Sequence, residues 1–210
     1  MLNTENVAFQ YNSERGFLFP QLQCKAGEIL LVTGQSGCGK TTLLHLLAGI
    51  LHTNQGKISI NNTDINTLSS AQKDAFRAKN IGLVYQKAHF LAALTVLDNL
   101  KLPGWLGHSK QDTKDILGLA DRLGVAHTLK QLPSKLSIGE QQRISIIRAV
   151  INHPSLLLAD EPTSALDDQN CDEVYGLLSE MAVQQGSALV IVTHDGRLKE
   201  KVKHQVDLNG

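Results

Sequence analysis

Residues 34–41 read Gly-Gln-Ser-Gly-Cys-Gly-Lys-Thr and match the pattern GxxxxGK[ST] at every fixed position. An apolar run at residues 28–33 precedes the pattern, and a helical pattern at residues 40–51 follows it. Glycines at these positions let successive backbone N–H groups and the positive end of a helix surround an anion. Because the strand, the turn and the helix are all present, the segment predicts a loop that holds nucleotide phosphates.

The side chains of this phosphate loop indicate how the nucleotide would be held. The ammonium group of Lys40 would neutralise the β- and γ-phosphates, and the hydroxyl of Thr41 would ligate Mg²⁺. ATP and Mg²⁺ are therefore the expected cofactors. The residues of the loop predicted to contact the nucleotide are Gly34, Gln35, Ser36, Gly37, Cys38, Gly39, Lys40, Thr41 and Thr42.

Two further apolar runs end in polar residues. Residues 155–159 precede Asp160 and Glu161, and residues 188–193 precede His194. Such runs are typical of strands buried on both faces of a parallel sheet, and ligands of open α/β sheets bind at the carboxyl edge. We predict an α/β fold of the P-loop NTPase type, with a RecA-like core, a mostly parallel sheet, and the Asp160 strand next to the strand of the phosphate loop.

The polar residues at these strand ends suggest a catalytic set. Asp160 would hold Mg²⁺, Glu161 would act as general base on the attacking water, and His194 would bond the γ-phosphate or fix that water. Carboxylates at strand ends are usually only solvated caps, but the phosphate loop favours the functional interpretation. For His194, position alone leaves the role of a polar cap equally open.

The chain reads as a single domain, residues 1–210, that begins with an antiparallel β-subdomain. Alternating apolar residues at 7–11 and a segment at 16–22, on either side of a polar turn at 12–14, predict this subdomain. Gly56 is expected to end the helix that begins at Lys40 and to precede a short strand at 57–60.

Residues 87–148 are predicted to form a helical subdomain inserted into an α/β core of residues 1–86 and 149–210. Helical patterns at 95–102 and 111–123 support this division, and Pro103, Gly104 and Gly107 are expected to break them. The basic segment 197–203 reads as a solvated helix face.

Charge and composition narrow the classes of partner. Lys plus Arg and Asp plus Glu each number 20, so the positive excess that marks general nucleic-acid binding is missing. The three cysteines form no CxxC pair, which argues against a disulfide framework or a zinc site. No run approaches the roughly 18–20 apolar residues that span a bilayer, so we expect a cytoplasmic protein without direct membrane insertion.

Residues 136–143, Leu-Ser-Ile-Gly-Glu-Gln-Gln-Arg, stand ahead of the Asp160–Glu161 strand and resemble the LSGGQ signature of ATP-binding-cassette (ABC) ATPases. The resemblance extends over essentially the whole chain. Tyr11 falls at the adenine-stacking aromatic, Gln86 at the Q-loop, residues 164–167 at the D-loop and His194 at the H-switch. An aromatic in a β-turn is the alternative interpretation for Tyr11.

The resemblance implies a homodimer in which two chains meet head to tail on ATP binding. Ser137, Gly139 and Glu140 of one chain would cover, in trans, the ATP bound to the other chain. Gln86 would sense Mg²⁺ and the attacking water, and Asp167 would touch the opposite protomer. The implied catalytic set is Lys40, Gln86, Glu161 and His194, and the implied metal set is Thr41, Gln86 and Asp160.

The signature departs from the family pattern at two positions. Ile138 replaces the first glycine of LSGGQ, and Glu140 replaces the glutamine, where glutamate is common in relatives. A β-branched residue is less expected beside a turn that must approach phosphate closely, because glycine is favoured there. We therefore expect weakened closure of the dimer.

Residues 81–86 and 94–103 resemble the ATPases of lipoprotein-release, macrolide-export and cell-division ABC systems. This resemblance implies an ATP-hydrolysing subunit that powers a separate integral membrane permease and lies at the inner face of the membrane through that partner. A soluble ABC ATPase acting on DNA or ribosomes is the alternative, although no coiled-coil insertion, tandem cassette or zinc module is visible. A P-loop kinase or GTPase would leave residues 137–143 unexplained.

Overall fold

The computed structural model describes residues 1–12, 15–107, 112–164 and 166–209. The strands are β1 Leu2–Asn12, β2 Arg15–Leu18, β3 Gln23–Cys24, β4 Ile29–Thr33, β5 Gln55–Ile60, β6 Thr63–Asp64, β7 Ile81–Val84, β8 Leu156–Asp160, β9 Ala188–Thr193 and β10 His204–Asp207. The α-helices are α1 Lys40–Leu47, α2 Ser70–Asn80, α3 Val96–Leu106, α4 Thr113–Arg122, α5 Ile138–Val150, α6 Asp168–Gln185 and α7 Gly196–Lys199. Three 3₁₀ turns are η1 Ile65–Thr67, η2 Ala126–Thr128 and η3 Pro133–Lys135.

The central sheet has the order β10-β4-β9-β8-β7, and all its neighbouring strands run parallel. This confirms the predicted α/β fold with a mostly parallel sheet. The Asp160 strand, β8, was predicted to lie next to β4, the strand that leads into the phosphate loop. This prediction was wrong, because β9 lies between them. His194, which follows β9, therefore lies between the two predicted halves of the site.

Both faces of this sheet are buried, as the continuous apolar runs predicted. In β8, Leu156 and Leu158 belong to one hydrophobic core, whereas Leu157 and Ala159 belong to another on the opposite face. The first core contains α1, and the second contains α6 and part of α5. Strand residues alternate between faces, so a strand covered on both sides needs apolar residues throughout.

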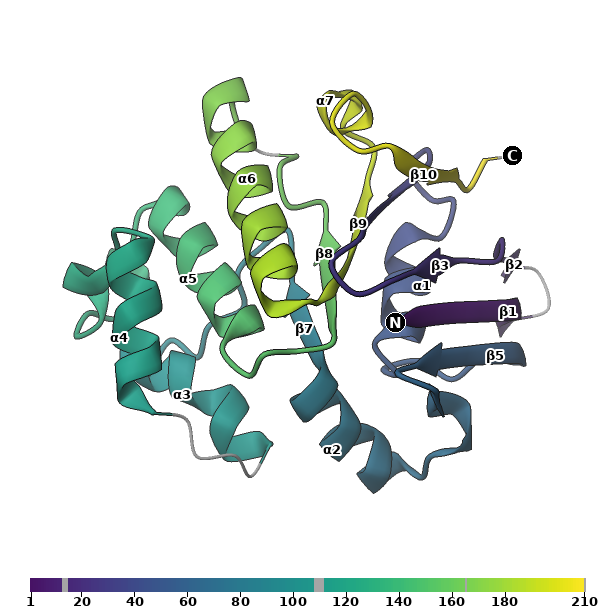
Figure 1. Cartoon of the computed structure of the whole chain (residues 1–210), viewed down its shortest axis with the longest axis horizontal. Coiled ribbons are helices and arrows are strands. Elements are labelled where there is room, and N and C mark those ends of the chain that lie inside the picture. The colour runs from purple at the N-terminus through teal and green to yellow at the C-terminus, as the bar shows by residue number, and fades with distance from the viewer. Residues whose placement is uncertain (13–14, 108–111, 165, 210) are drawn as a thin grey trace.

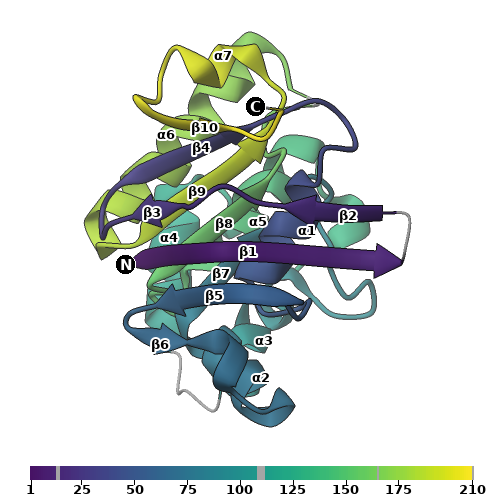
Figure 2. The same ribbon diagram turned by 90° about the vertical axis from the view of Figure 1, so that its right-hand side faces the viewer.

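A second, antiparallel sheet has the order β2-β1-β5-β6, with β3 also paired to β1. This confirms the antiparallel N-terminal sheet, although part of its turn, residues 13–14, lies outside the described residues. Helix α1 packs between the two sheets, because its leucines share one core with β1 and β5 and with β4, β8 and β9. Figure 2 shows β1 and β5 in front of α1.

Helix α1 is shorter than the sequence predicted. It ends at Leu47, where Gly49 takes a left-handed backbone (φ 65°), rather than at Gly56. Glycine adopts this conformation without the steric cost that other residues meet, so the first available glycine ends the helix. The predicted short strand is present as β5 and begins at Gln55.

Helices α3, α4 and α5 gather on the side of the parallel sheet opposite β1 and β5 (Figure 1) and share a third hydrophobic core. This core supports the proposed helical subdomain. The predicted break at Pro103 was wrong, because α3 continues through it to Leu106. Proline removes one N–H donor, but the buried Leu100 and Gly104 on either side hold the helix in place. Gln111, the predicted start of the next helix, lies outside the described residues.

Within the described part of the chain, no helix combines the length and the apolar character needed to cross a bilayer.

Candidate functional site

The phosphate loop connects β4 to α1 and has the backbone that its glycines permit. Gly37 (φ 86°) and Gly39 (φ 100°) are both left-handed, and Gly39 is the N-cap of α1. A Cβ at residue 39 would also lie 2.7 Å from the ring of Phe17. The site thus requires glycine at position 39 for conformation and for space.

The side chain of Lys40 folds back over this loop. Its Nζ donates hydrogen bonds to the backbone oxygens of Gly34 at 2.7 Å and Gln35 at 3.0 Å. The nearest carboxylate oxygen is Oε1 of Glu161, at 3.7 Å. Lys40 is only 8% exposed, so a full positive charge lies largely buried at the mouth of the loop. A buried cation is costly unless anions surround it, and a phosphate would provide them.

Thr41, in the first turn of α1, and Asp160, at the end of β8, lie together although β8 is not adjacent to the β4 strand that leads into the phosphate loop. The hydroxyl of Thr41 donates to Asp160 Oδ2 at 3.1 Å, with Oδ1 at 3.5 Å. Burial raises the pKa of the Asp160 carboxyl above its ordinary value, and the hydrogen bond from Thr41 opposes this rise. A hydroxyl beside a buried carboxylate is a donor set of hard oxygens, which suits Mg²⁺.

The carboxylate of Glu161 is fixed by the end of β9. Oε2 accepts from the Thr193 hydroxyl at 2.7 Å and from the backbone N–H of His194 at 3.3 Å. Oε1 lies 2.7 Å from Nδ1 of His194. Glu161 itself has a left-handed backbone (φ 48°), a strained conformation that the surrounding contacts must hold. The sequence analysis gave Thr193 no role. Its position at a strand end, directly before His194, is the feature that could have indicated one.

Gln86 follows β7 and connects to the same edge of the sheet. Its Nε2 donates to Ser164 Oγ at 2.9 Å, and that hydroxyl donates to the backbone oxygen of Glu161 at 3.2 Å. In the described part of the chain, no hydrogen bond joins Gln86 to Thr41 or Asp160. Of the three predicted metal ligands, Thr41 and Asp160 are therefore in contact, whereas Gln86 is bonded to Ser164.

Tyr11 lies beside the phosphate loop. Its hydroxyl is 3.1 Å from Oγ1 of Thr42, and its ring meets those of Phe9 and Phe17 edge-on. The side chain is half exposed. A half-exposed aromatic ring next to the loop can stack on a flat ring.

The signature segment begins α5. Ser137 is the N-cap and forms a capping box with Glu140, while Ile138 is 74% exposed. Among the described residues, neither Ser137 nor Glu140 makes a hydrogen bond or ion pair to the phosphate loop. The structure thus brings Lys40 and Glu161 together. Of the signature, Gln142 reaches the neighbouring backbone oxygen of Pro162, at 3.1 Å.

The D-loop, residues 164–167, includes Ala165, which lies outside the described residues. Asp167 is the N-cap of α6, and the hydrogen bond from the backbone N–H of Asn170 lowers the pKa of its carboxyl. Arg197, predicted as part of a solvated face, instead reaches this loop. It donates to the backbone oxygens of Thr163 and Leu166, each at 3.2 Å. These acceptors are backbone atoms, so no residue pattern could indicate them.

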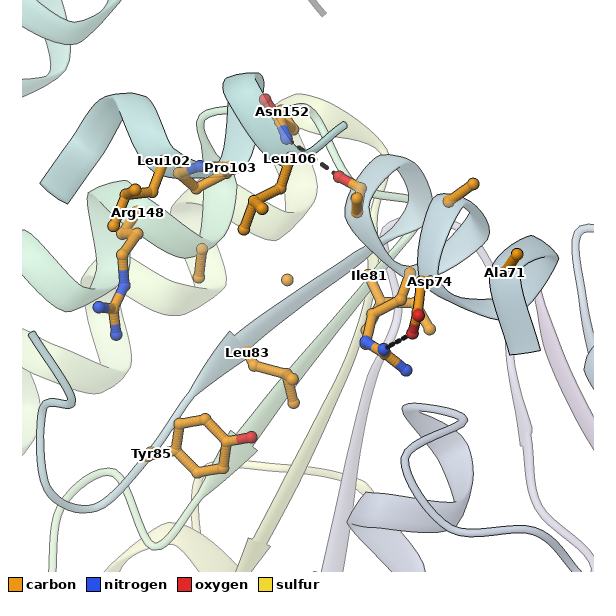
Figure 3. A pocket seen from close by; sticks show the side chains of 15 residues that line it. Ala71, Asp74, Ile81, Leu83, Tyr85, Leu102, Pro103, Leu106, Arg148 and Asn152 are labelled. Carbon is orange, nitrogen blue, oxygen red and sulfur yellow. Dashed lines mark hydrogen bonds and ion pairs between the residues drawn. The ribbon is translucent and has the colours of Figure 1, made fainter. Parts of the chain in front are cut away.

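A groove of about 730 Å³ lies between α2, β7, α3 and α5. Leu102, Pro103 and Leu106 form its α3 side, and Figure 3 shows them across from Ile81. The guanidinium group of Arg148 also lies in this view and stands 4.8 Å from the centre of the Phe90 ring. No residue of the phosphate loop lines the groove, and the β7 strand that lines it leads to Gln86.

Residues 20–164 match the family model described as ABC transporter. The chain belongs to this family. It is 40% identical over 184 residues to the lipoprotein-releasing system ATP-binding protein LolD of Shewanella frigidimarina, covering 87% of the chain and 77% of the relative. The LolD of Shewanella denitrificans matches equally, with 79% of that relative covered.

Solved structures of this family have the same fold. The dimeric ATP-binding cassette MJ0796, in a post-hydrolysis state with ADP and Pi, matches with a TM-score of 0.87 and 28% identity, over 99% of this chain and 94% of that chain. An inward-facing putative metal-chelate type ABC transporter matches with a TM-score of 0.79 and 33% identity, over 99% of this chain and 79% of that chain. As an ABC protein, the chain is an ATP-binding ATPase, which confirms the predicted family, fold and enzyme class.

Proposed function

We propose that two copies of this chain hydrolyse ATP to power a separate integral membrane permease. One observation carries the proposal. Lys40, the Thr41–Asp160 pair and the Glu161–His194 pair meet at one edge of the parallel sheet. Within the described residues, the signature residues Ser137 and Glu140 form no hydrogen bond or ion pair with these side chains. Each chain would then contribute its phosphate loop to one ATP site and its signature to the other, and neither site would be complete without the second chain.

Residues 34–42 would bind the phosphates, and Tyr11 would stack on the adenine. Lys40 now donates to two carbonyl oxygens, and phosphate oxygens would be stronger acceptors because the hydrogen bonds would be charge-assisted. The left-handed glycines of the loop allow the backbone to turn N–H groups toward an anion.

Thr41 and Asp160 would hold Mg²⁺, with Gln86 reaching it from the Q-loop. Mg²⁺ keeps several waters and phosphate oxygens in its shell, so few protein ligands suffice. Consistent with this, the described residues contain no group of three or more His, Cys, Asp or Glu that could hold a metal alone. When bound, Mg²⁺ would neutralise charge on the phosphate oxygens.

Glu161 would act as the general base of hydrolysis. Three hydrogen bonds from Thr193 and His194 orient its carboxylate before a water arrives, which limits the cost of reorganisation. It would accept a proton as that water attacks the γ-phosphate. His194 would hold the carboxylate and the γ-phosphate in register, and Gln86 would position the water.

The signature of a second chain would complete the site. Ser137, Gly139 and Glu140 stand at the N-terminal end of α5, where backbone N–H groups and the helix dipole favour an anion. The similarity to a dimeric cassette supports this homodimer. Asp167, at the start of α6, would contact the opposite chain.

The permease would occupy the groove between α2, β7, α3 and α5, and would keep the chain at the cytoplasmic face of the membrane. Leu106 is 71% exposed at the groove rim, which suits contact with an apolar segment. Nucleic acid is not an expected partner, because the net formal charge is zero.

Affinity purification from detergent-solubilised membranes tests the partner. We expect an integral membrane protein to co-purify with the chain, and Leu106→Asp to release it while the ATPase activity of the free chain persists. Leu18→Asp is the matched control, because Leu18 is 79% exposed on β2, away from the groove. Co-purification of ribosomes or DNA instead would favour the alternative of a soluble ABC ATPase.

A further inference from the structure

The N-terminal end of α5 carries a negative charge where the proposed function requires an anion to bind. Oε2 of Glu140 accepts from the backbone N–H of Ser137 at 2.8 Å and from the Ser137 hydroxyl at 2.7 Å. The backbone N–H of Glu140 donates in return to Ser137 Oγ at 3.3 Å. The Ser137 hydroxyl proton is thus already donated to a carboxylate of its own chain.

This carboxylate stays ionised. The hydrogen bonds from Ser137 are the main reason that the pKa of Glu140 is lowered, and His127 contributes as well. A glutamine at this position would offer the same capping geometry without a charge. With glutamate, an approaching phosphate meets a like charge at the helix end, and like charges at close range repel.

The imidazole of His127 faces this carboxylate on its other side. Nε2 of His127, in the turn η2, lies 2.9 Å from Oε1 of Glu140. The His127 side chain is 63% exposed, and that of Glu140 is 22% exposed. The two oxygens of Glu140 are therefore divided between Ser137 and His127.

We infer that His127 is a positioning residue for ATP-driven closure: as an imidazolium it offsets the charge of Glu140 and fixes the carboxylate that orients Ser137. This inference rests on the proposed function, in which Ser137 meets the nucleotide of a second chain. Without the imidazolium, Glu140 would repel the incoming phosphate, so closure would require more ATP. The effect depends on charge and therefore disappears if residue 140 is neutral.

A double-mutant cycle tests this inference in a Glu161→Gln background, which we expect to block turnover and trap the closed dimer. The measurement is the ATP concentration at which half of the chain is dimeric by light scattering. We expect His127→Ala to raise it by about five-fold when Glu140 is present and to leave it unchanged in Glu140→Gln. His127→Lys, which keeps a positive charge, should restore part of the loss.

Two further measurements distinguish the proposed charge effect on dimerisation from a general change in the structure. The affinity of the monomer for ADP should be equal in all variants, because His127 makes no hydrogen bond or ion pair to the phosphate loop within the described residues. His204→Ala on the edge strand β10 removes another exposed histidine and should change nothing.

Either an unchanged half-dimerisation concentration in His127→Ala or an equal shift in both residue-140 backgrounds overturns the inference. If the Glu161→Gln parent itself forms no dimer with ATP, the proposed function fails as well, and the parent measurement distinguishes that failure from the others.

Discussion

Nδ1 of His194 donates a hydrogen bond to Oε1 of Glu161 over 2.7 Å, joining the residues that follow the adjacent strands β9 and β8. The same carboxylate lies 3.7 Å from Nζ of Lys40, beside the phosphate loop. A base that is fixed on one side by an imidazole and on the other by a cation has little freedom to move. This arrangement gives Glu161 and Lys40 different roles, which substitutions can separate.

Glu161→Gln should abolish ATP turnover and preserve ATP binding. The amide keeps the size and much of the hydrogen bonding of the carboxylate, but it cannot accept a proton from water, so we expect a loss of roughly 10²–10⁴-fold in kcat. Phosphate release measures turnover, and light scattering with ATP should show a trapped dimer. Glu173→Gln, on the exposed side of α6, is the control. Retained turnover would remove Glu161 from its role as base.

Lys40→Ala should weaken ATP binding itself. The change deletes the buried ammonium that would pair with the β- and γ-phosphates, and a loss of about 10- to 150-fold in affinity corresponds to one or two charge-assisted hydrogen bonds. Fluorescence titration with a nucleotide analogue measures it. Lys57→Ala, an exposed lysine in β5, should bind normally. Unchanged affinity in Lys40→Ala would contradict the assigned phosphate site.

Ile138→Gly should raise ATPase activity or tighten the ATP-bound dimer. Ile138 is 74% exposed at the N-terminal end of α5, where its branched side chain would separate the backbone from a phosphate. Glycine lets backbone approach closely, although it also costs about 0.5–1 kcal/mol of helix stability. Turnover rates and dimerisation should be compared with those of Ile138→Ala, which shortens the side chain but keeps Cβ. Equal rates and equal dimerisation in all three proteins would reject this role.

The sequence predicted the parts of the site that depend on local pattern. Strands β4, β8 and β9 are continuous apolar runs, and the phosphate loop has glycine where the backbone is left-handed. The order of these strands was predicted wrongly, because local pattern does not encode which strand a crossover places beside another. Pro103 was predicted to end its helix, because the local pattern does not show the tertiary contacts by which Val96 and Leu100 hold α3 in the third core.

Other features could not be predicted because their partners are distant or lack a side-chain signature. Arg197 binds the backbone oxygens of Thr163 and Leu166, which any residues could provide. His127 and Glu140 meet because η2 packs against the start of α5, and a separation of 13 positions has no meaning in sequence. The spacing of Ser137 and Glu140, by contrast, is that of a capping box and is readable.

Gly82→Ala should destabilise the fold. Gly82 lies in β7, and a Cβ at this position would be 2.2 Å from the backbone oxygen of Ala149 in α5, so either the helix or the strand must move. We expect a loss of about 3 kcal/mol in the free energy of unfolding, measured with urea. Gly118→Ala in α4 is the matched control, because its Cβ would meet no atom within 4 Å. That variant should be stabilised by about 0.5–1 kcal/mol. Similar midpoints for the two variants would show that β7 and α5 can separate at little cost.

Arg197→Ala should destabilise the protein more at neutral pH than near pH 2. Hydrogen bonds from Arg197 lower the pKa of the Asp195 carboxyl to about 2, below its ordinary value near 3.9. A carboxyl whose folded-state pKa is depressed contributes stability that is fully present above the unfolded pKa and is lost as pH falls through the folded pKa. The difference in free energy of unfolding between wild type and Arg197→Ala should therefore be constant above about pH 5 and shrink between pH 4 and pH 2. Urea unfolding at a series of pH values measures this difference, with Arg143→Ala as the control for an ion pair at the surface. Curves that remain parallel down to pH 2 would mean that Arg197 acts only through the backbone oxygens of Thr163 and Leu166, which do not titrate.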